Sequence, residues 1–236
     1  MHLTGLLLQV TEAAKSLDQA IPSEEEAKEI TMPIWDLVIQ GGWVMAILGV
    51  FLIVAVFIFI ERFLVLNKAA REDKNFMGNL KDYILKGKLD NARDLCKQQN
   101  SPISRMIEKG VSRIGKPLND INAAIENVGK LEVSRLEKNI AALATISGAG
   151  PMLGFLGTVI GMIRAFYDMS MAGNNIDIVT LSSGIYQAMV TTVAGLIVGI
   201  LAYICYNILV ARVEKMVFLL EARATEFMDL LHEPAA

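Results

Sequence analysis

Polar side chains recur on one face of a long apolar stretch near the C-terminal end of the chain. Gln187, Thr191 and Gly195 follow one another at four-residue spacing, which places them on the same side of a helix. Thr192 borders this face, and Gly199 continues it by one turn. A face of amide, hydroxyls and glycines is too polar for lipid, so it must meet another helix or a hydrated path.

A second apolar stretch carries small residues at helical spacing. It contains two small-xxx-small pairs, a pattern that lets helix backbones approach closely in a membrane: Gly150 with Gly154, and Gly157 with Gly161. Pro151 removes one backbone hydrogen bond and favours a kink, and Thr158 stands beside the second glycine pair. From these residues alone, packing between helices and the lining of a pore remain alternatives for the polar groups.

The chain has no cluster of the residue types that catalyse reactions or bind metals. Its two cysteines, Cys96 and Cys205, lie in a charged and an apolar segment, so we expect free thiols. His2 and His232 lie at opposite ends of the chain. Nucleotide-binding glycine patterns, nucleophile motifs and metal-ligand spacings do not occur. We therefore expect no enzyme, no catalytic residue, no metal and no cofactor.

The composition is typical of a membrane protein. Of the 236 residues, 53% are hydrophobic and 20% charged, against about 45–50% and about 25% in soluble domains. Uncharged runs of 24, 25 and 34 residues occur at Leu37–Ile60, Asn139–Ile163 and Ile178–Ala211. As helices, each can cross a hydrocarbon core of roughly 30 Å. The net charge of −3 offers no basic surface for phosphates, which excludes a nucleic-acid partner.

None of the three runs contains Asp, Glu, Lys or His. A membrane protein that moves ions normally places an ionisable group in the path. Either this chain moves no ions, or a partner supplies the carboxylate.

Basic residues predict the orientation in the membrane. Sixteen of the 22 Lys and Arg residues lie between residues 61 and 138, and the link 168–177 has none. Positive charge marks the cytoplasmic side. The predicted order is an acidic periplasmic segment (1–32), a first transmembrane helix (33–66), a cytoplasmic helical domain (67–138), a second transmembrane helix (139–167), a periplasmic link (168–177), a third transmembrane helix (178–211) and a cytoplasmic C-terminal helix (212–236).

The predicted cytoplasmic domain shows apolar residues at helical spacing, interrupted by Gly87, Gly115 and the helix-starting pair Ser101-Pro102. No turn signal separates Pro117 from Gly148, so one long helix is expected to run from about residue 117 into the membrane. The apolar spacing also continues past Arg212. The predicted fold is therefore an all-α polytopic membrane protein whose second and third transmembrane helices extend into a cytoplasmic helical bundle.

The sequence Gly-Pro-Met-Leu-Gly-Phe-Leu-Gly-Thr-Val-Ile-Gly-Met-Ile at 150–163 resembles the signature of the ExbB/TolQ family, proton channels that are also related to MotA. Residues 184–189, with Thr192, Gly195-Leu196 and Tyr206-Asn207, are similar to the third span of that family. The predicted topology agrees, and the resemblance covers most of the chain from about residue 34. The short cytoplasmic segment and the second-span motif favour ExbB/TolQ over MotA.

The resemblance implies a stator subunit of an ion-driven molecular motor in the bacterial inner membrane. In such motors a pentamer, surrounded by membrane lipids, encloses a dimer of a single-span ExbD/TolR-like partner that carries an aspartate. In the ExbB branch, the proton (or sodium) motive force acts through a TonB-like protein on transport across the outer membrane. A TolQ-type subunit for envelope integrity and a non-conducting membrane scaffold are the alternatives.

Motif position implies the roles of single residues. Thr158 and Thr192 match the family's pore threonines, and with Gln187 and Thr191 they form the predicted ion path. ExbB and TolQ usually have glutamate where this chain has Gln187, and a neutral amide cannot take up a proton, so the choice of ion stays open. The predicted packing residues of the pore are Gly150, Pro151, Gly154, Gly157, Gly161, Gly195 and Gly199.

Overall fold

The structure is a computed structural model that describes residues 41–70, 75–171 and 178–232. The acidic segment 1–32, the start of the first predicted transmembrane helix and most of the 168–177 link lie outside the described residues. The described chain is helical and contains no strand, so the all-α prediction is confirmed. Its helices are α3 (Gly42–Ala69), α4 (Phe76–Leu85), α5 (Leu89–Gln99), α6 (Pro102–Val111), α7 (Leu118–Glu137), α8 (Ile140–Met171) and α9 (Ile178–His232).

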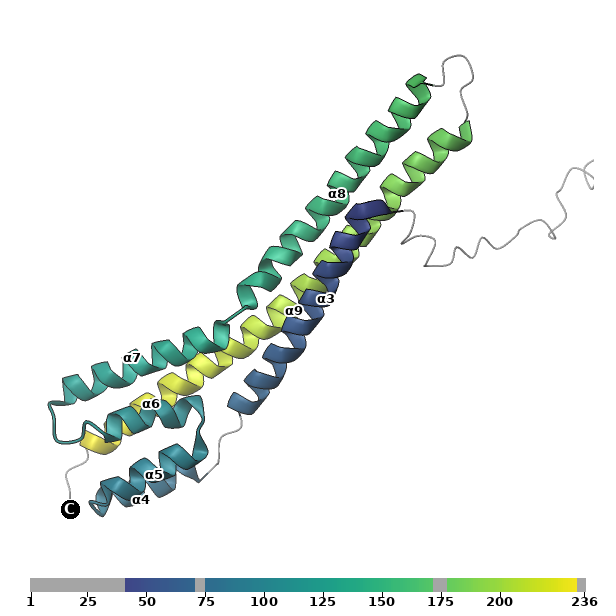
Figure 1. The fold of residues 1–236 in the computed structure, drawn as a ribbon. Helices are drawn as coiled ribbons and strands as arrows, with labels where there is room; N and C mark the ends of the chain where they lie inside the picture. Colours follow the sequence, from purple (N-terminus) through teal and green to yellow (C-terminus); the bar gives the residue numbers. More distant parts are fainter. Residues whose placement is uncertain (1–40, 71–74, 172–177, 233–236) are drawn as a thin grey trace, which may run out of the picture. The chain divides into compact units, whose positions relative to one another are not determined.

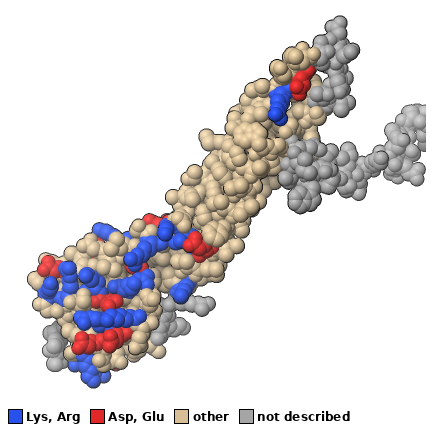
Figure 2. Space-filling model, viewed as in Figure 1, with Lys and Arg blue, Asp and Glu red and all other residues tan. Residues whose placement is uncertain are grey.

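Three helical stretches are long and apolar enough to cross a membrane, namely Gly42–Ala69, Leu118–Met171 and Leu181–His232. Large apolar side chains are exposed on all three, among them Phe57, Phe155 and Ile197. In Figure 2, Lys, Arg, Asp and Glu gather over the end of the molecule that holds α4 to α7, whereas α3, α8 and the first half of α9 present an almost uncharged surface. Exposed apolar side chains of this kind make favourable contacts with the hydrocarbon chains of lipid.

The third long helix is continuous, but the second is not. Helix α9 runs for 55 residues without interruption, as the spacing past Arg212 predicts. The helix expected to be continuous from about residue 117 is broken between α7 and α8, where Lys138 is extended (φ −50°, ψ 134°) and Asn139 is left-handed (φ 65°). Asparagine adopts this conformation more readily than most residues, because its short amide can hydrogen-bond locally.

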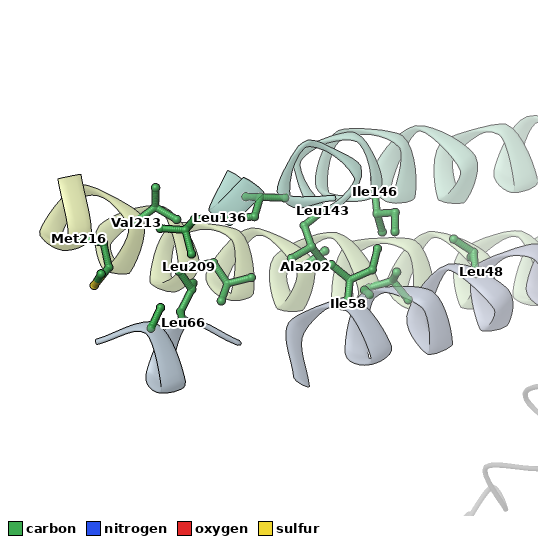
Figure 3. Packing of buried hydrophobic residues seen from close by; sticks show 14 of the residues in the cluster. Leu48, Ile58, Leu66, Leu136, Leu143, Ile146, Ala202, Leu209, Val213 and Met216 are labelled. Atoms are coloured by element: carbon green, nitrogen blue, oxygen red, sulfur yellow. The ribbon is translucent and has the colours of Figure 1, made fainter. Parts of the chain in front are cut away.

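Helices α3, α7, α8 and α9 share one hydrophobic core (Figure 3). Leu48, Ile58 and Leu66 of α3 pack with Leu143 and Ile146 of α8 and with Leu209 of α9, and all are at most 7% exposed. Helices α8 and α9 lie side by side through the membrane-spanning part, and α7 follows the second half of α9 (Figure 1).

A second core joins α4, α5, α6 and α7 to the end of α9, and we call this group the α4–α7 cluster. Its centre includes Phe76, Ile107, Ile125 and Phe227, each at most 1% exposed. Cys96 is also buried here, and burial raises the pKa of its thiol to about 12, with the charge of Glu108 adding to the effect. Both cysteines are free thiols, as expected.

Candidate functional site: a glycine seam between α8 and α9

Helices α8 and α9 meet through residues that have little or no side chain. Gly150, Gly154, Gly157 and Gly161 of α8 face Ala188, Thr191, Gly195 and Gly199 of α9, and we call these eight residues the glycine seam. A Cβ placed on Gly195 would lie 2.7 Å from the carbonyl oxygen of Gly150 and 2.7 Å from Cα of Gly154. The two backbones therefore touch directly, which only glycine allows at this point.

Pro151 and Gly199 lie at the end of the seam nearest to α7. Helix α8 continues through Pro151, whose missing N–H leaves the carbonyl of Ser147 without its usual helical donor. A Cβ on Gly199 would lie 2.6 Å from the proline ring and 3.1 Å from that carbonyl oxygen. Gly199 thus provides the space in which α9 accommodates the proline.

Thr158 and Thr192 form a hydroxyl pair at one edge of the seam. Their Oγ1 atoms lie 2.6 Å apart, and each also lies 3.2 Å from the carbonyl oxygen of Gly154. Both side chains are half-buried. The structure therefore brings together the two threonines that the sequence motif singles out, on different helices and 34 positions apart.

The hydroxyl pair cannot make all three of these hydrogen bonds at once. Each hydroxyl has one proton, so the pair has two protons for three contacts. One threonine donates to the other, which donates to Gly154. The first threonine then keeps both acceptor lone pairs, and the half-buried edge leaves them accessible to a donor outside this chain. The pair can reverse its direction by rotating its hydroxyls, without moving a heavy atom.

Thr191 lies inside the seam rather than on its edge. Its side chain is 2% exposed, and its hydroxyl donates to the carbonyl of Ala188 in its own helix at 2.8 Å. A Cβ on Gly157 would lie 2.5 Å from Thr191 Oγ1. Thr191 therefore fills the space above Gly157 in the seam.

Gln187 precedes Thr191 by one turn of α9 and lies beside the start of α3. A Cβ on Gly42 would lie 3.2 Å from Gln187 Nε2. The amide lines a cavity of about 240 Å³ together with Gly41, Gly157, Gly161 and Arg164. This volume has room for several waters, and the amide offers both donors and an acceptor. Gln187 therefore lines a cavity between α3, α8 and α9 that Thr191 also lines, whereas Thr158 and Thr192 do not.

The seam holds no ionisable group of its own. The uncharged runs at 139–163 and 178–211 include all eight seam residues, and Arg164 follows directly after the first run. Within the described ranges, no three His, Cys, Asp or Glu side chains are placed to hold a metal ion. What the seam and its edge offer an ion or a proton is neutral: the hydroxyls of Thr158 and Thr192, the nearby amide of Gln187 and backbone carbonyls.

A buried carboxylate outside the membrane-spanning part was missed by the sequence analysis. Glu132 of α7 is 2% exposed, and its two oxygens accept from Arg105 of α6 at 2.5 Å and from Arg135 at 2.6 Å. Arg62 of α3 is 7% exposed and donates to the carbonyl of Arg135 at 3.3 Å and to Glu61 at 2.7 Å. This network ties the end of α3 to α6 and α7.

A scan against known families matches the chain to the MotA/TolQ/ExbB proton channel family over residues 98–222. The chain belongs to this family. The match covers α6 to α8 and α9 as far as residue 222, and so includes the glycine seam, the hydroxyl pair and Glu132. The resemblance inferred from the second-span motif is confirmed, and the protein is a multi-pass membrane protein of the ExbB/TolQ type.

Curated members of the family match over part of their length. A biopolymer transport protein ExbB homolog of Methanothermobacter thermautotrophicus is 32% identical over 128 residues, which is 54% of this chain and 44% of that protein. The Tol-Pal system protein TolQ of Pseudomonas aeruginosa is 31% identical over 120 residues, 48% of this chain and 52% of that protein. The biopolymer transport protein ExbB of Helicobacter pylori is 39% identical over 77 residues, 33% of this chain and 52% of that protein. The matched part thus spans about half of these relatives or less.

Proposed function

We propose that the protein is an ExbB-like stator subunit that works as a homo-oligomer, a pentamer by analogy with its family. In this proposal an ExbD/TolR-like single-span partner dimer brings an aspartate into the pore, and the proton or sodium motive force acts through a TonB-like protein on transport across the outer membrane. The orientation proposed with it has the N-terminus in the periplasm and the C-terminus in the cytoplasm, because the basic residues lie between residues 61 and 138.

The observation that carries the proposal is the hydroxyl pair. Thr158 and Thr192 present unused acceptor lone pairs at a half-buried edge, within the parts of α8 and α9 (139–163 and 178–211) that contain no carboxylate. A partner aspartate needs such neutral groups along its path, since they can hydrogen-bond to the protonated carboxyl and to the carboxylate in turn through water. The pair can respond to either state by reversing its own hydrogen bond.

The test replaces each hydroxyl by a methyl group of similar shape. Thr158→Val and Thr192→Val remove one hydroxyl each, and we expect proton flux through the complex with its partner to fall about tenfold or more, since an unsatisfied polar group costs about 1–3 kcal/mol. Flux is measured in proteoliposomes that contain the co-expressed complex. Thr145→Val is the matched control, because Thr145 lies on α8 outside the seam and bonds only to the carbonyl of Ala141 in its own helix, at 3.1 Å.

Normal flux in both variants would exclude the hydroxyl pair from the ion path. A complex that contains no partner with a membrane-embedded carboxylate, as shown by native mass spectrometry after co-expression with its chromosomal neighbours, would favour the non-conducting scaffold.

A TolQ-type role is the second candidate, favoured by the 31% identity to TolQ of Pseudomonas aeruginosa. The two branches differ in what depends on the motor. Loss of energised nutrient uptake on deletion of the gene supports the ExbB-like role, whereas leakage of periplasmic proteins with normal uptake supports the TolQ-type role.

A further inference from the structure

A cationic pocket lies where α3 ends against α6 and α7, outside the glycine seam. Its cavity of about 330 Å³ is lined by Lys68 and Val65 of α3, Arg105 of α6, and Glu132, Arg135 and Leu136 of α7. We call it the α3–α6–α7 pocket. Its lining combines charged and apolar side chains, and none of its residues belongs to the proposed ion path.

Positive charge exceeds negative charge around this pocket. Glu132 is the one carboxylate among the lining residues, and both its oxygens are already used by Arg105 and Arg135. Lys68 has no ion-pair partner among the described residues, and the Arg135 side chain is 68% exposed, with further N–H groups free.

Two arginines at this pocket also have a hydrogen-bond donor that no described acceptor satisfies. Arg62, next to the pocket, and Arg105 each have a buried Nε without a hydrogen-bond partner in the described part of the chain. Counting Arg62, Lys68, Arg105 and Arg135 against Glu61 and Glu132, four positive charges face two negative ones. An anion is the ligand that such a surplus favours.

The position of the pocket along α3 indicates that the anion belongs to a lipid. Exposed apolar side chains continue on α3 up to Leu64 (62% exposed) and Val65 (39% exposed), so lipid contact extends that far. Lys68 is exposed and lies one turn beyond, where we expect the lipid headgroups to begin. Basic pockets at this level on membrane helices bind the headgroups of anionic lipids.

We propose that the α3–α6–α7 pocket binds the phosphate group of an anionic phospholipid, with Lys68 and Arg135 as the groups that contact it. Arg105 and Arg62 donate hydrogen bonds to groups of this chain, and their positive charges add to the attraction for the phosphate. The lipid joins the end of a membrane helix to two helices outside the membrane, so its binding stabilises their mutual position. The proposal does not depend on the stator function.

The test measures the stabilisation of the full-length protein by lipid. The protein is purified in a neutral detergent. Its thermal unfolding midpoint is then measured while phosphatidylglycerol, phosphatidylcholine or inorganic phosphate is added. A ligand that binds only the folded state raises the midpoint in proportion to its occupancy. We expect phosphatidylglycerol to raise it, and the other two to have little effect, because choline is repelled by the cations and free phosphate lacks the acyl chains.

The variant Lys68→Gln/Arg135→Gln removes the two contacting charges and leaves Glu132 paired with Arg105. At about a fivefold loss of affinity for each cation, binding of phosphatidylglycerol should weaken about 25-fold. Lys109→Gln/Lys116→Gln is the matched control, because it removes two exposed lysines outside the pocket lining. It should retain the wild-type response.

Three outcomes would overturn the proposal. An equal response to phosphatidylcholine would show that the headgroup charge is not recognised. An equal loss in both double variants would reduce the effect to general surface charge. A full response to inorganic phosphate alone would assign the pocket to a soluble anion instead of a lipid.

Discussion

The glycine seam and the α4–α7 cluster are held together in opposite ways. In the seam, two helices meet through Gly150, Gly154 and Gly195, with backbone against backbone. In the cluster, large side chains such as Phe76 and Phe227 are fully buried between helices. The seam also leaves large apolar side chains exposed on the outer faces of α8 and α9, as Phe155 and Ile197 show, whereas the cluster turns its charged residues outward.

The difference follows from the solvent around each region. In lipid, burying an apolar side chain between helices releases little free energy, because the lipid tails are equally apolar. Close backbone contact and dispersion must therefore hold the helices together. In water, removal of apolar surface provides the driving force, and a flexible side chain can adjust to its neighbours. The seam is therefore expected to tolerate added atoms poorly, and the cluster to depend on volume and on its buried charges.

The largest effect is predicted for Gly195→Ala. The new methyl group would lie 2.7 Å from the carbonyl oxygen of Gly150 and from Cα of Gly154, and backbone atoms cannot turn aside. The helices must separate, and we expect a loss of about 3 kcal/mol in stability. The thermal unfolding midpoint of the detergent-solubilised protein measures it, at roughly 2–4 °C per kcal/mol.

Gly148→Ala is the matched control on α8. A Cβ on Gly148 meets nothing within 4 Å, and alanine favours helix by about 1 kcal/mol over glycine. This variant should be neutral or slightly stabilised. If both variants unfold at the wild-type temperature, α8 and α9 do not meet through backbone contacts and the contrast between the two regions is lost.

A smaller effect is predicted for Glu132→Gln. The amide oxygen can still accept from one arginine, but the other loses its partner and the buried charge of Glu132 is gone. We expect a loss of about 2 kcal/mol, since hydrogen bonds to charged groups contribute about 1.5–3 kcal/mol and the exposed side of Arg135 can turn to water. The unfolding midpoint again provides the measurement.

Glu126→Gln is the comparison for this variant. Glu126 pairs with Lys130 at 2.7 Å on the same helix, and the hydrogen bond and charge of Lys130 lower the pKa of its carboxyl. Because this carboxylate is exposed, water replaces the pair at little cost and no shift in the midpoint is expected. An equal loss in the two variants would mean that burial of Glu132 adds nothing.

The features that sequence predicted here are those fixed by neighbours along the chain. Glycine pairs spaced by four residues define one face of α8, and Ser101-Pro102 starts α6 where a cap and a first-turn proline are expected. Three uncharged runs likewise identify the apolar helices. Each of these signals needs only the geometry of a single helix.

The features that sequence missed depend on contacts between helices. Periodicity places Gln187, Thr191 and Gly195 on one face, but only the packing of α3 and α8 shows that Gln187 lines a cavity and that Thr191, at the same cavity, is 2% exposed and packs against Gly157. Glu132 looks like a solvent-facing residue until α6 brings Arg105 to it. The break at Asn139 has only a weak local signal, since asparagine permits the left-handed conformation without requiring it.

The smallest effect, predicted for Ser101→Ala, tests whether the cluster also depends on single polar contacts. Ser101 Oγ accepts from the backbone N–H of Ser104 at 3.1 Å, and Ser104 Oγ accepts from the N–H of Ser101 at 2.8 Å. Both residues are buried, so the N–H of Ser104 finds no water when the cap is removed. A loss of about 1 kcal/mol is expected, seen as faster amide hydrogen exchange in the first turn of α6. Ser134→Ala, at an exposed position of α7, should leave exchange unchanged. Equal exchange in the two variants would mean that apolar burial alone holds α6 in place, which would make the contrast with the seam sharper still.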